Sequence, residues 1–428
     1  MKRFIAENGI ELYTIDGIAI ARELGLGGRI NTILQSAFFK ITNIIPADDA
    51  VKFMKAAAAA SYGDKGEAVI AMNYAAIDRG MDGVVKVDYP ADEWKNAEGE
   101  IPVPAATGDR KDLVDFVNHV LFPAVAQKGD TLPVSAFRGI EDGTMPSGTA
   151  AYEKRGIAVD VPVWKPEACI QCNFCSYVCP HASIRPAVLT DAELAAAPEG
   201  MKSVPMTGMP GLHFAVTVST LDCTGCGSCI NVCPGKKGEK ALVAESFESQ
   251  LHEQDVFGYG VALPEKPELS EKFKPTTLKG SQFKQPLLEF SGACAGCGET
   301  PYAKLVTQLF GDRMYIANAT GCSSIWGGSA PSTPYTVNKE GKGPAWANSL
   351  FEDNAEYGYG MLLGQDAIRA SLIEKVKSIA ETGKNEAAVS AAKEYLDTAD
   401  HGAENAAATE KLVAALEVPD NARVLVPA

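Results

Sequence analysis

The sequence has no long hydrophobic run and little positive charge. No uncharged apolar stretch is long enough to span a bilayer, and residues 1–9 lack the apolar segment of a secretory signal. Lys and Arg number 39 against 54 Asp and Glu, giving a formal net charge of −15, and no basic stripe stands out. We therefore expect no membrane association and no nonspecific nucleic-acid binding. We expect a cytoplasmic protein, because thiols stay reduced in that compartment.

Cysteine, in contrast, follows a repeated pattern. The sequence holds 11 cysteines, and eight of them form two C-x2-C-x2-C-x3-C-P runs, at residues 169–180 and 223–234. This is the spacing of bacterial two-cluster ferredoxins, in which one loop supplies three ligands and the fourth cysteine binds the other cluster. We therefore predict two 4Fe–4S sites. Their ligand sets are Cys169, Cys172, Cys175 and Cys233 for one, and Cys223, Cys226, Cys229 and Cys179 for the other.

Disulfides and tetrahedral zinc sites are the competing uses of eight cysteines. Disulfides are typical of short secreted chains, and zinc ribbons usually have separate C-x2-C pairs. Small or uncharged residues lie between the cysteines, including Asn173, Gly225 and Gly227. They allow backbone N–H groups to turn toward the sulfur atoms and tune the reduction potential. His181 either tunes a cluster through a hydrogen bond or merely begins a helix, and we expect the helix start.

Three cysteines remain, and three is one too few for a further cluster. Cys294 and Cys297 form a C-x2-C pair, whereas Cys322 follows an apolar stretch at residues 314–320. That stretch is typical of a buried strand, and small residues after such a strand form the ligand-binding crevice of α/β folds. The fourth ligand is either another residue type or a cysteine outside this chain.

The 428 residues, 46% hydrophobic, are typical of a globular protein of about three domains. We predict an α/β multidomain protein with an inserted α+β two-cluster ferredoxin-like domain. In the first unit we expect a strand at 10–16, a helix at 18–24, a turn at Gly25–Gly28, and helices at 31–40 and 48–61. One strand does not make a parallel sheet, so this unit resembles the back half of a domain. The predicted divisions are 1–95 (α/β unit), 96–165 (connector with a helix at 111–121), 166–245 (two-cluster domain), 246–290 (connector) and 291–428 (α/β unit with exposed helices from 367).

Several motifs, in the same order along nearly the whole chain, carry a resemblance to a known family. They are GLGGRINT (25–32), AFFK (37–40), LPVSAF (132–137), DGT (142–144), EKRG (153–156), both cysteine runs, FSGACAGCGE (290–299), NATGCSSIWGG (318–328) and WANSLFEDN (346–354). Together they are similar to pyruvate:ferredoxin (flavodoxin) oxidoreductases, which use thiamine diphosphate and iron–sulfur clusters. The resemblance implies that 1–95 ends a gamma-like domain and that 291–428 begins the thiamine-diphosphate-binding domain.

The resemblance also accounts for the three remaining cysteines. It implies a third 4Fe–4S cluster, held by Cys294, Cys297, Cys322 and a later cysteine that this sequence does not contain. It further implies that Glu299 and Cys322 touch thiamine diphosphate, bound with Mg²⁺, and that Phe351 walls its apolar pocket. The thiamine-ring domain before this segment and the G-D-G motif after it are not present, so we expect an internal fragment or one part of a split enzyme. We identify no catalytic base.

The activity implied is oxidative decarboxylation of pyruvate with coenzyme A to acetyl-CoA and CO₂. Thiamine acts as the electron sink, and the clusters pass single electrons to ferredoxin or flavodoxin. A homodimer of the full-length chain is also implied. Two alternatives stay open: a stand-alone electron-transfer subunit without catalysis, and a related enzyme for another 2-oxoacid.

Overall fold

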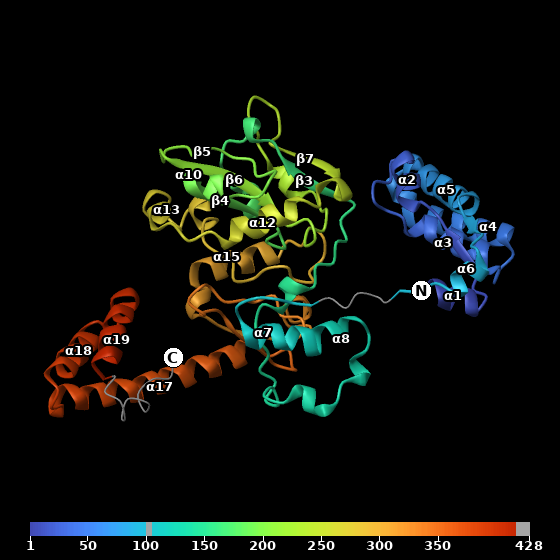
Figure 1. Ribbon diagram of the computed structural model, residues 1–428. Coiled ribbons are helices and arrows are strands. Elements are labelled where there is room, and N and C mark those ends of the chain that lie inside the picture. Colours follow the sequence, from blue (N-terminus) through green and yellow to red (C-terminus); the bar gives the residue numbers. More distant parts are fainter. Residues whose placement is uncertain (100–104, 417–428) are drawn as a thin grey trace. The chain divides into compact units, whose positions relative to one another are not determined.

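The computed structural model describes residues 1–99 and 105–416. The chain divides into two compact units, Met1–Val103 and Pro104–Ala428 (Figure 1). In the described part of the chain, no helix combines the length and the apolar character needed to cross a bilayer.

The first unit is mainly helical. Its two strands, β1 and β2, pair antiparallel with Tyr13 opposite Lys86. The first strand is shorter than predicted. The three predicted helices lie within two residues of their predicted bounds, whereas three further helices among the described residues of this unit were not predicted. The elements are α1 (Lys2–Glu7), β1 (Leu12–Thr14), α2 (Gly17–Glu23), α3 (Asn31–Thr42), α4 (Ala47–Tyr62), α5 (Glu67–Asp82), β2 (Val85–Val87) and α6 (Ala91–Lys95).

A close crossing of α3 and α5 organises the core of this unit. Ile33 and Ile77 are fully buried. Ser36 donates its hydroxyl to the carbonyl of Ile77 at 2.5 Å. A Cβ on Gly80 would lie only 2.5 Å from the carbonyl oxygen of Ile33, so the two helices approach too closely for any larger residue there. The predicted turn is present, and Gly25 within it has φ 75°.

The second unit begins with a continuous helical segment. It comprises α7 (Lys111–Phe116), a π-helical turn (Val117–Leu121) and α8 (Phe122–Val125). The segment therefore extends four residues beyond the predicted helix. Its buried side includes Leu113, Val117 and Leu121. Among the described residues, short 3-10 turns lie at Gly63–Lys65, Gly129–Thr131, Val134–Phe137, Thr149–Tyr152, Pro166–Ala168, Phe247–Gln250 and Gly311–Arg313.

Two antiparallel sheets enclose the cysteine runs. One has the strand order β4-β6-β5, and the other pairs β3 with β7, placing Trp164 opposite Leu242. Trp164 and Phe214 meet edge to face, with ring centroids 6.1 Å apart, in the largest apolar core. The elements are β3 (Asp160–Trp164), α9 (Phe174–Tyr177), β4 (Ile184–Thr190), α10 (Asp191–Ala195), β5 (Val204–Pro205), β6 (Leu212–Val218), α11 (Ser228–Val232) and β7 (Leu242–Ser246).

The segment predicted as a second connector carries three helices: α12 (Glu253–Ala262), α13 (Pro267–Lys272) and α14 (Leu278–Ser281). Helix α12 packs on β4 and β6 (Figure 1). Tyr259 on this helix donates its hydroxyl to the carbonyl of Glu193, next to the sheet. The segment is thus packed against the two-cluster region, and its predicted boundaries stay a prediction.

The last part of the second unit contains a short parallel sheet and a helical arm. β8 (Tyr315–Asn318) and β9 (Ala345–Asn348) run parallel. α15 (Thr300–Phe310) precedes β8, and α16 (Cys322–Gly328) follows it. The arm comprises α17 (Asn354–Thr382), α18 (Glu386–Asp397) and α19 (Gly402–Leu416). It starts earlier than predicted and buries a small core of its own, including Val376, Ala392 and Leu412.

Candidate functional site

The two cysteine runs adopt the same backbone conformation at corresponding positions. In the first run, Gln171 and Asn173 have φ values of 58° and 64°. In the second run, Gly225 and Gly227 have φ values of 66° and 74° at the same places. These left-handed residues turn each loop tightly, which allows three cysteines to face one cavity.

Side-chain hydrogen bonds hold the two non-glycine residues in this conformation. The amide of Gln171 donates to the carbonyl of Pro205 at 2.9 Å and accepts from the backbone N–H of Thr207 at 2.9 Å. Asn173 donates to the carbonyl of Lys279 at 3.0 Å. Both residues are buried, so these bonds stabilise a backbone conformation that is otherwise unfavourable for a residue with a Cβ.

Backbone N–H groups point at the sulfur atoms, as expected from the small intervening residues. In each run the residue two positions after the first cysteine donates its N–H to the sulfur of that cysteine. In the second run the residue just before β7 also donates its N–H to the last cysteine. The bonds are Gln171 N to Cys169 Sγ (3.3 Å), Gly225 N to Cys223 Sγ (3.4 Å) and Ala241 N to Cys233 Sγ (3.3 Å). Such bonds stabilise the thiolate form that a metal cluster requires.

Each of two neighbouring cavities is lined by four cysteines. The fourth cysteine of each run lies with the other run, as the spacing predicts, while ligation itself stays a prediction. One cavity is lined by Cys169, Cys172, Cys175 and Cys233. The other is lined by Cys179, Cys223, Cys226 and Cys229.

Burial raises the pKa of several of these thiols. It raises the pKa of Cys223 to about 12. Burial also raises the pKa of Cys175 and of Cys229, and repulsion from neighbouring thiolates, including Cys175 beside Cys229, adds to the effect. Buried thiolates of this kind need cationic partners, which the iron atoms of a cluster would supply. The donor set therefore fits two iron–sulfur clusters.

The remaining C-x2-C pair lies directly against the second run. A Cβ on Gly296, between Cys294 and Cys297, would lie 3.7 Å from the Cβ of Cys226. Cys297 precedes α15, and its sulfur accepts the N–H of Glu299 at 3.4 Å. Burial works to raise the pKa of Cys297, but the backbone N–H groups of Thr300 and Glu299 outweigh it, so the pKa lies below its ordinary value. Helix N-termini favour thiolates in this way.

His181, which follows the first cysteine run, is hydrogen-bonded to the segment that carries Cys294 and Cys297. It is buried and donates from Nε2 to the carbonyl of Ala293 at 2.9 Å, the residue before Cys294. Burial lowers its pKa, which keeps the imidazole neutral. The expected helix start is wrong, because His181 lies in the turn before β4. Its contact was not predictable from sequence, since the partner lies 112 residues away.

The EKRG motif at residues 153–156 supports the second run from the other side. Lys154 forms an ion pair with Asp222, whose side chain is buried. Gly156 donates its N–H to the carbonyl of Leu221 at 2.8 Å. The motif thus fixes the two residues that precede Cys223.

The predicted cofactor contacts gather at the carboxyl end of the parallel sheet. Cys322 begins α16 just after β8, and Phe351 follows β9. Both are exposed, Phe351 by 74%. Trp326 on α16 donates its indole N–H to the carboxylate of Glu299 at 3.2 Å, which links Cys322 to the C-x2-C pair indirectly. Among the described residues, no three His, Cys, Asp or Glu side chains form a group that could hold a single metal ion.

A buried lysine was missed by the sequence analysis. Lys304 on α15 is 2% exposed, and its ammonium donates to the carbonyls of Ser176, Tyr177 and Cys179. Burial lowers its pKa to about 8. The periodicity of α15 indicates the opposite orientation, because this helix buries Thr300, Lys304, Thr307 and Gln308 and exposes apolar side chains.

The cavities and their thiols are typical of an iron–sulfur protein, and matches of this sequence to known protein families agree. Residues 168–237 match the family described as a 4Fe–4S dicluster domain. Residues 1–83 match the family described as pyruvate ferredoxin/flavodoxin oxidoreductase, and residues 104–158 match a domain of unknown function.

Curated relatives extend these matches over most of the chain. The pyruvate-flavodoxin oxidoreductases of Klebsiella pneumoniae and Enterobacter agglomerans are 52% and 54% identical over 94% and 88% of this chain. The pyruvate:ferredoxin oxidoreductase of Moorella thermoacetica is 56% identical over 85% of it. Over most of its length the chain is therefore similar to one segment of pyruvate-flavodoxin and pyruvate:ferredoxin oxidoreductases. It spans about a third of the length of these relatives, covering 33%, 31% and 30% of them in the same order.

Proposed function

We propose that this chain is the electron-relay portion of a 2-oxoacid oxidoreductase that converts pyruvate and coenzyme A to acetyl-CoA and CO₂. In this proposal it passes electrons through iron–sulfur clusters to ferredoxin or flavodoxin. The names of the relatives support the substrate and the acceptors. The observation that carries the proposal is the serial arrangement of three cysteine groups within one packed unit.

The contacts give the order of the groups. The turn between Cys294 and Cys297 lies beside Cys226, since a Cβ on Gly296 would come within 3.7 Å of the Cβ of Cys226. Cys226 belongs to the second cavity, and Cys229 of that cavity is an electrostatic neighbour of Cys175 in the first. Electrons that enter near the pair therefore meet the second cavity before the first. Iron–sulfur clusters, when bound, accept and release single electrons, whereas thiamine diphosphate supplies the electron sink for decarboxylation.

The chain's own residues prepare these positions in three ways. Backbone N–H groups donate hydrogen bonds to the sulfur atoms of Cys169, Cys223 and Cys233. The apolar core around Trp164 and Phe214 excludes water from the inner side of the cavities. Low polarity and hydrogen bonds to sulfur are two of the features that set a cluster's reduction potential.

The thiamine-facing part of the proposal concerns three residues. We infer that Cys322 and Phe351 face thiamine diphosphate and its Mg²⁺ from the carboxyl edge of the parallel sheet, with Glu299 beside them. Their common location around β8, β9 and α16 supports this assignment. Cys294, Cys297 and Cys322 would hold a third cluster with a fourth ligand from elsewhere. We also propose a homodimer of the complete enzyme and a cytoplasmic location, where free thiols persist.

The experiment uses native protein purified anaerobically from its source. Pyruvate with coenzyme A is added, and reduction of the clusters is followed by visible absorbance and electron paramagnetic resonance. We expect reduction that requires both compounds, and slower or no reduction with 2-oxobutyrate or 2-oxoglutarate. Clusters that dithionite reduces but pyruvate and coenzyme A do not would reject the catalytic reading and leave a stand-alone electron carrier.

A further inference from the structure

Lys304 is a buried cation that contacts the main chain between Cys175 and Cys179. Its ammonium lies 3.2 Å from the carbonyl oxygens of Tyr177 and of Cys179, and it also donates to the carbonyl of Ser176. The thiols of Cys175 and Cys179 contribute to its electrostatic environment, as does the guanidinium of Arg185, which forms an ion pair with Glu289. The cation therefore faces the main chain that connects the two ligand sets.

The segment that Lys304 contacts contributes a cysteine to each of the two cavities. Cys175 lines the first cavity and Cys179 lines the second. Only three residues separate them, and the carbonyls that hold the ammonium belong to this short segment. Thiolate-ligated clusters are anionic, so one cation at this point stabilises added negative charge on either side.

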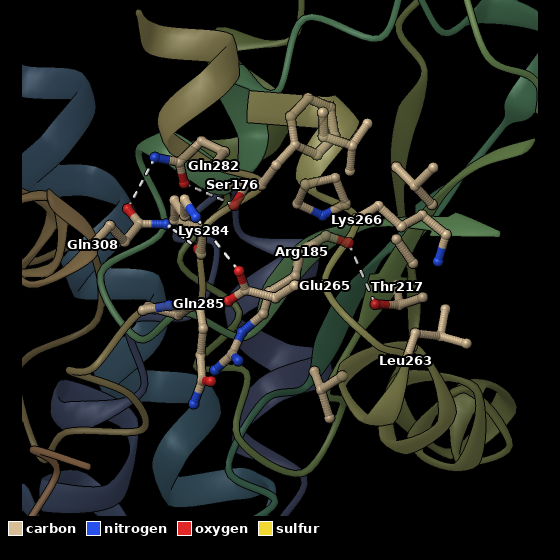
Figure 2. Close-up of a pocket in the computed structure, with 18 of the residues that line it drawn as sticks. Ser176, Arg185, Thr217, Leu263, Glu265, Lys266, Gln282, Lys284, Gln285 and Gln308 are labelled. Carbon is tan, nitrogen blue, oxygen red and sulfur yellow. Dashed lines mark hydrogen bonds and ion pairs between the residues drawn. The ribbon is translucent and has the colours of Figure 1, made fainter. Parts of the chain in front are cut away.

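Neutral, hydrogen-bonded side chains link α9 to α15, the helix that carries Lys304. The hydroxyl of Ser176 on α9 donates to the side chain of Gln282 at 2.9 Å, and Gln282 donates to Gln308 on α15 at 3.0 Å (Figure 2). These three uncharged side chains form a hydrogen-bonded chain between the two helices. A cavity of about 110 Å³ is lined by these three side chains and by Lys304. Lys266, which also lines it, forms an ion pair with Glu193 at 3.0 Å.

We propose that Lys304 is the charge-compensating residue of the relay, and that its ammonium raises the reduction potential of both clusters. Reduction adds a negative charge to a cluster, and a buried cation favours the reduced form because the low-polarity interior screens the attraction weakly. α15 thereby links the segment that carries Cys294 and Cys297 to the energetics of the two cavities. The inference rests on the proposed electron relay.

The test compares three variants of the cluster-loaded protein by redox titration with electron paramagnetic resonance. Lys304→Gln keeps hydrogen-bond donors near the three carbonyls but removes the charge. Lys304→Arg keeps the charge, and the adjoining cavity gives its larger head group room. Lys284→Gln is the matched control, because Lys284 lines the same cavity but is partly exposed and pairs with Glu265 at 3.4 Å.

We expect both midpoint potentials to become more negative in Lys304→Gln and to stay near the wild-type values in the other two variants. Loss of iron in Lys304→Gln with retention in Lys304→Arg would also support the charge role. Unchanged potentials in Lys304→Gln, or loss of iron in both Lys304 variants, would overturn it. A wild-type protein without redox-active clusters would instead reject the proposed relay itself, so the two failures are distinct.

Discussion

Four residues of the cysteine runs need left-handed backbone, yet only the second run uses glycine for it. Gly225 has a further reason to lack a side chain, because a Cβ there would lie 2.9 Å from the carbonyl oxygen of Asp160 on β3. Gly227 has nothing within 4 Å of that position. The two glycines thus share the conformational requirement and differ in packing.

Alanine at these two positions separates strain from steric clash. Both substitutions cost roughly 1–2 kcal/mol for the positive φ. Gly225→Ala is expected to cost roughly a further 1–3 kcal/mol, because Asp160 must move. The measurement is the guanidinium concentration at which each variant loses its cluster absorbance. Equal midpoints for Gly225→Ala and Gly227→Ala would show that the contact with β3 does not constrain the loop.

The lowered pKa of Cys297 predicts unusual reactivity in iron-free protein. Its thiolate is present below the pH at which an ordinary thiol ionises, so its alkylation should reach the maximal rate at a lower pH than that of N-acetylcysteine. Mass spectrometry of iodoacetamide-treated peptides measures this rate across pH. In guanidinium the backbone N–H bonds are lost, and the profile should become ordinary. A native profile that matches the denatured one would refute the helix-terminus effect.

Residue-level prediction from sequence succeeded where the signal is local. The spacing of eight cysteines is a local property, and the cavities group them as the spacing predicts. Lys304 and His181 have no such signal, because their partners lie more than 100 residues away in the chain. Their roles depend on which segments pack together.

At the scale of elements, α15 shows why periodicity alone misleads. An amphipathic helix is normally expected to bury its apolar side. Here Tyr302 is 70% and Phe310 50% exposed, whereas Thr307 and Gln308 are buried against neighbouring segments. Hydrogen bonds to backbone carbonyls stabilise the buried polar side. The predicted helices of the first unit were found close to their expected positions, and Asp16 caps the first of them, α2.

The crossing of α3 and α5 gives an element-scale prediction. Gly80→Ala is expected to destabilise this crossing by roughly 1–3 kcal/mol, because the added Cβ overlaps Ile33 and Ser36. Hydrogen exchange of peptides from both helices, measured by mass spectrometry, should become faster. Gly63→Ala is the control, since it has open space, and its exchange should not change. Unchanged protection in Gly80→Ala would contradict the described packing.

The capping box of α10 predicts a pH dependence. Burial works to raise the pKa of Glu193, but the N–H of Thr190 and the ammonium of Lys266 outweigh it, so the pKa lies below 4.5 in the folded protein. The stabilisation is therefore present above pH 4.5 and is lost as pH falls through the folded pKa.

Glu193→Gln tests this dependence. It should lower stability by about 1 kcal/mol at pH 7, and the difference from wild type should shrink below pH 4.5. The measurement is the guanidinium midpoint, followed by tryptophan fluorescence at each pH. A difference that stays constant down to pH 3 would assign the effect to packing instead of charge.

At the scale of the whole molecule, the pairing of distant segments could not be read from the sequence. β3 precedes both cysteine runs and β7 follows them, so their pairing closes a region of more than 70 residues around the cavities. The segment at 246–290 reads as a connector from its composition, yet α12 covers the sheet. Turn residues and apolar patterns locate elements, whereas tertiary contacts decide which elements enclose the site.

The central claim is that two interleaved cysteine sets hold two clusters. The most direct measurement is the iron content of the anaerobically reconstituted chain beside that of Cys226→Ser. We expect about eight irons for the two sites, or about twelve if the Cys294, Cys297 and Cys322 group also fills, and a loss of about four in the variant. The loss should destabilise the region around both runs, because ligation energy is folding energy in so small a unit. Unchanged iron content and visible absorbance in Cys226→Ser would contradict the account.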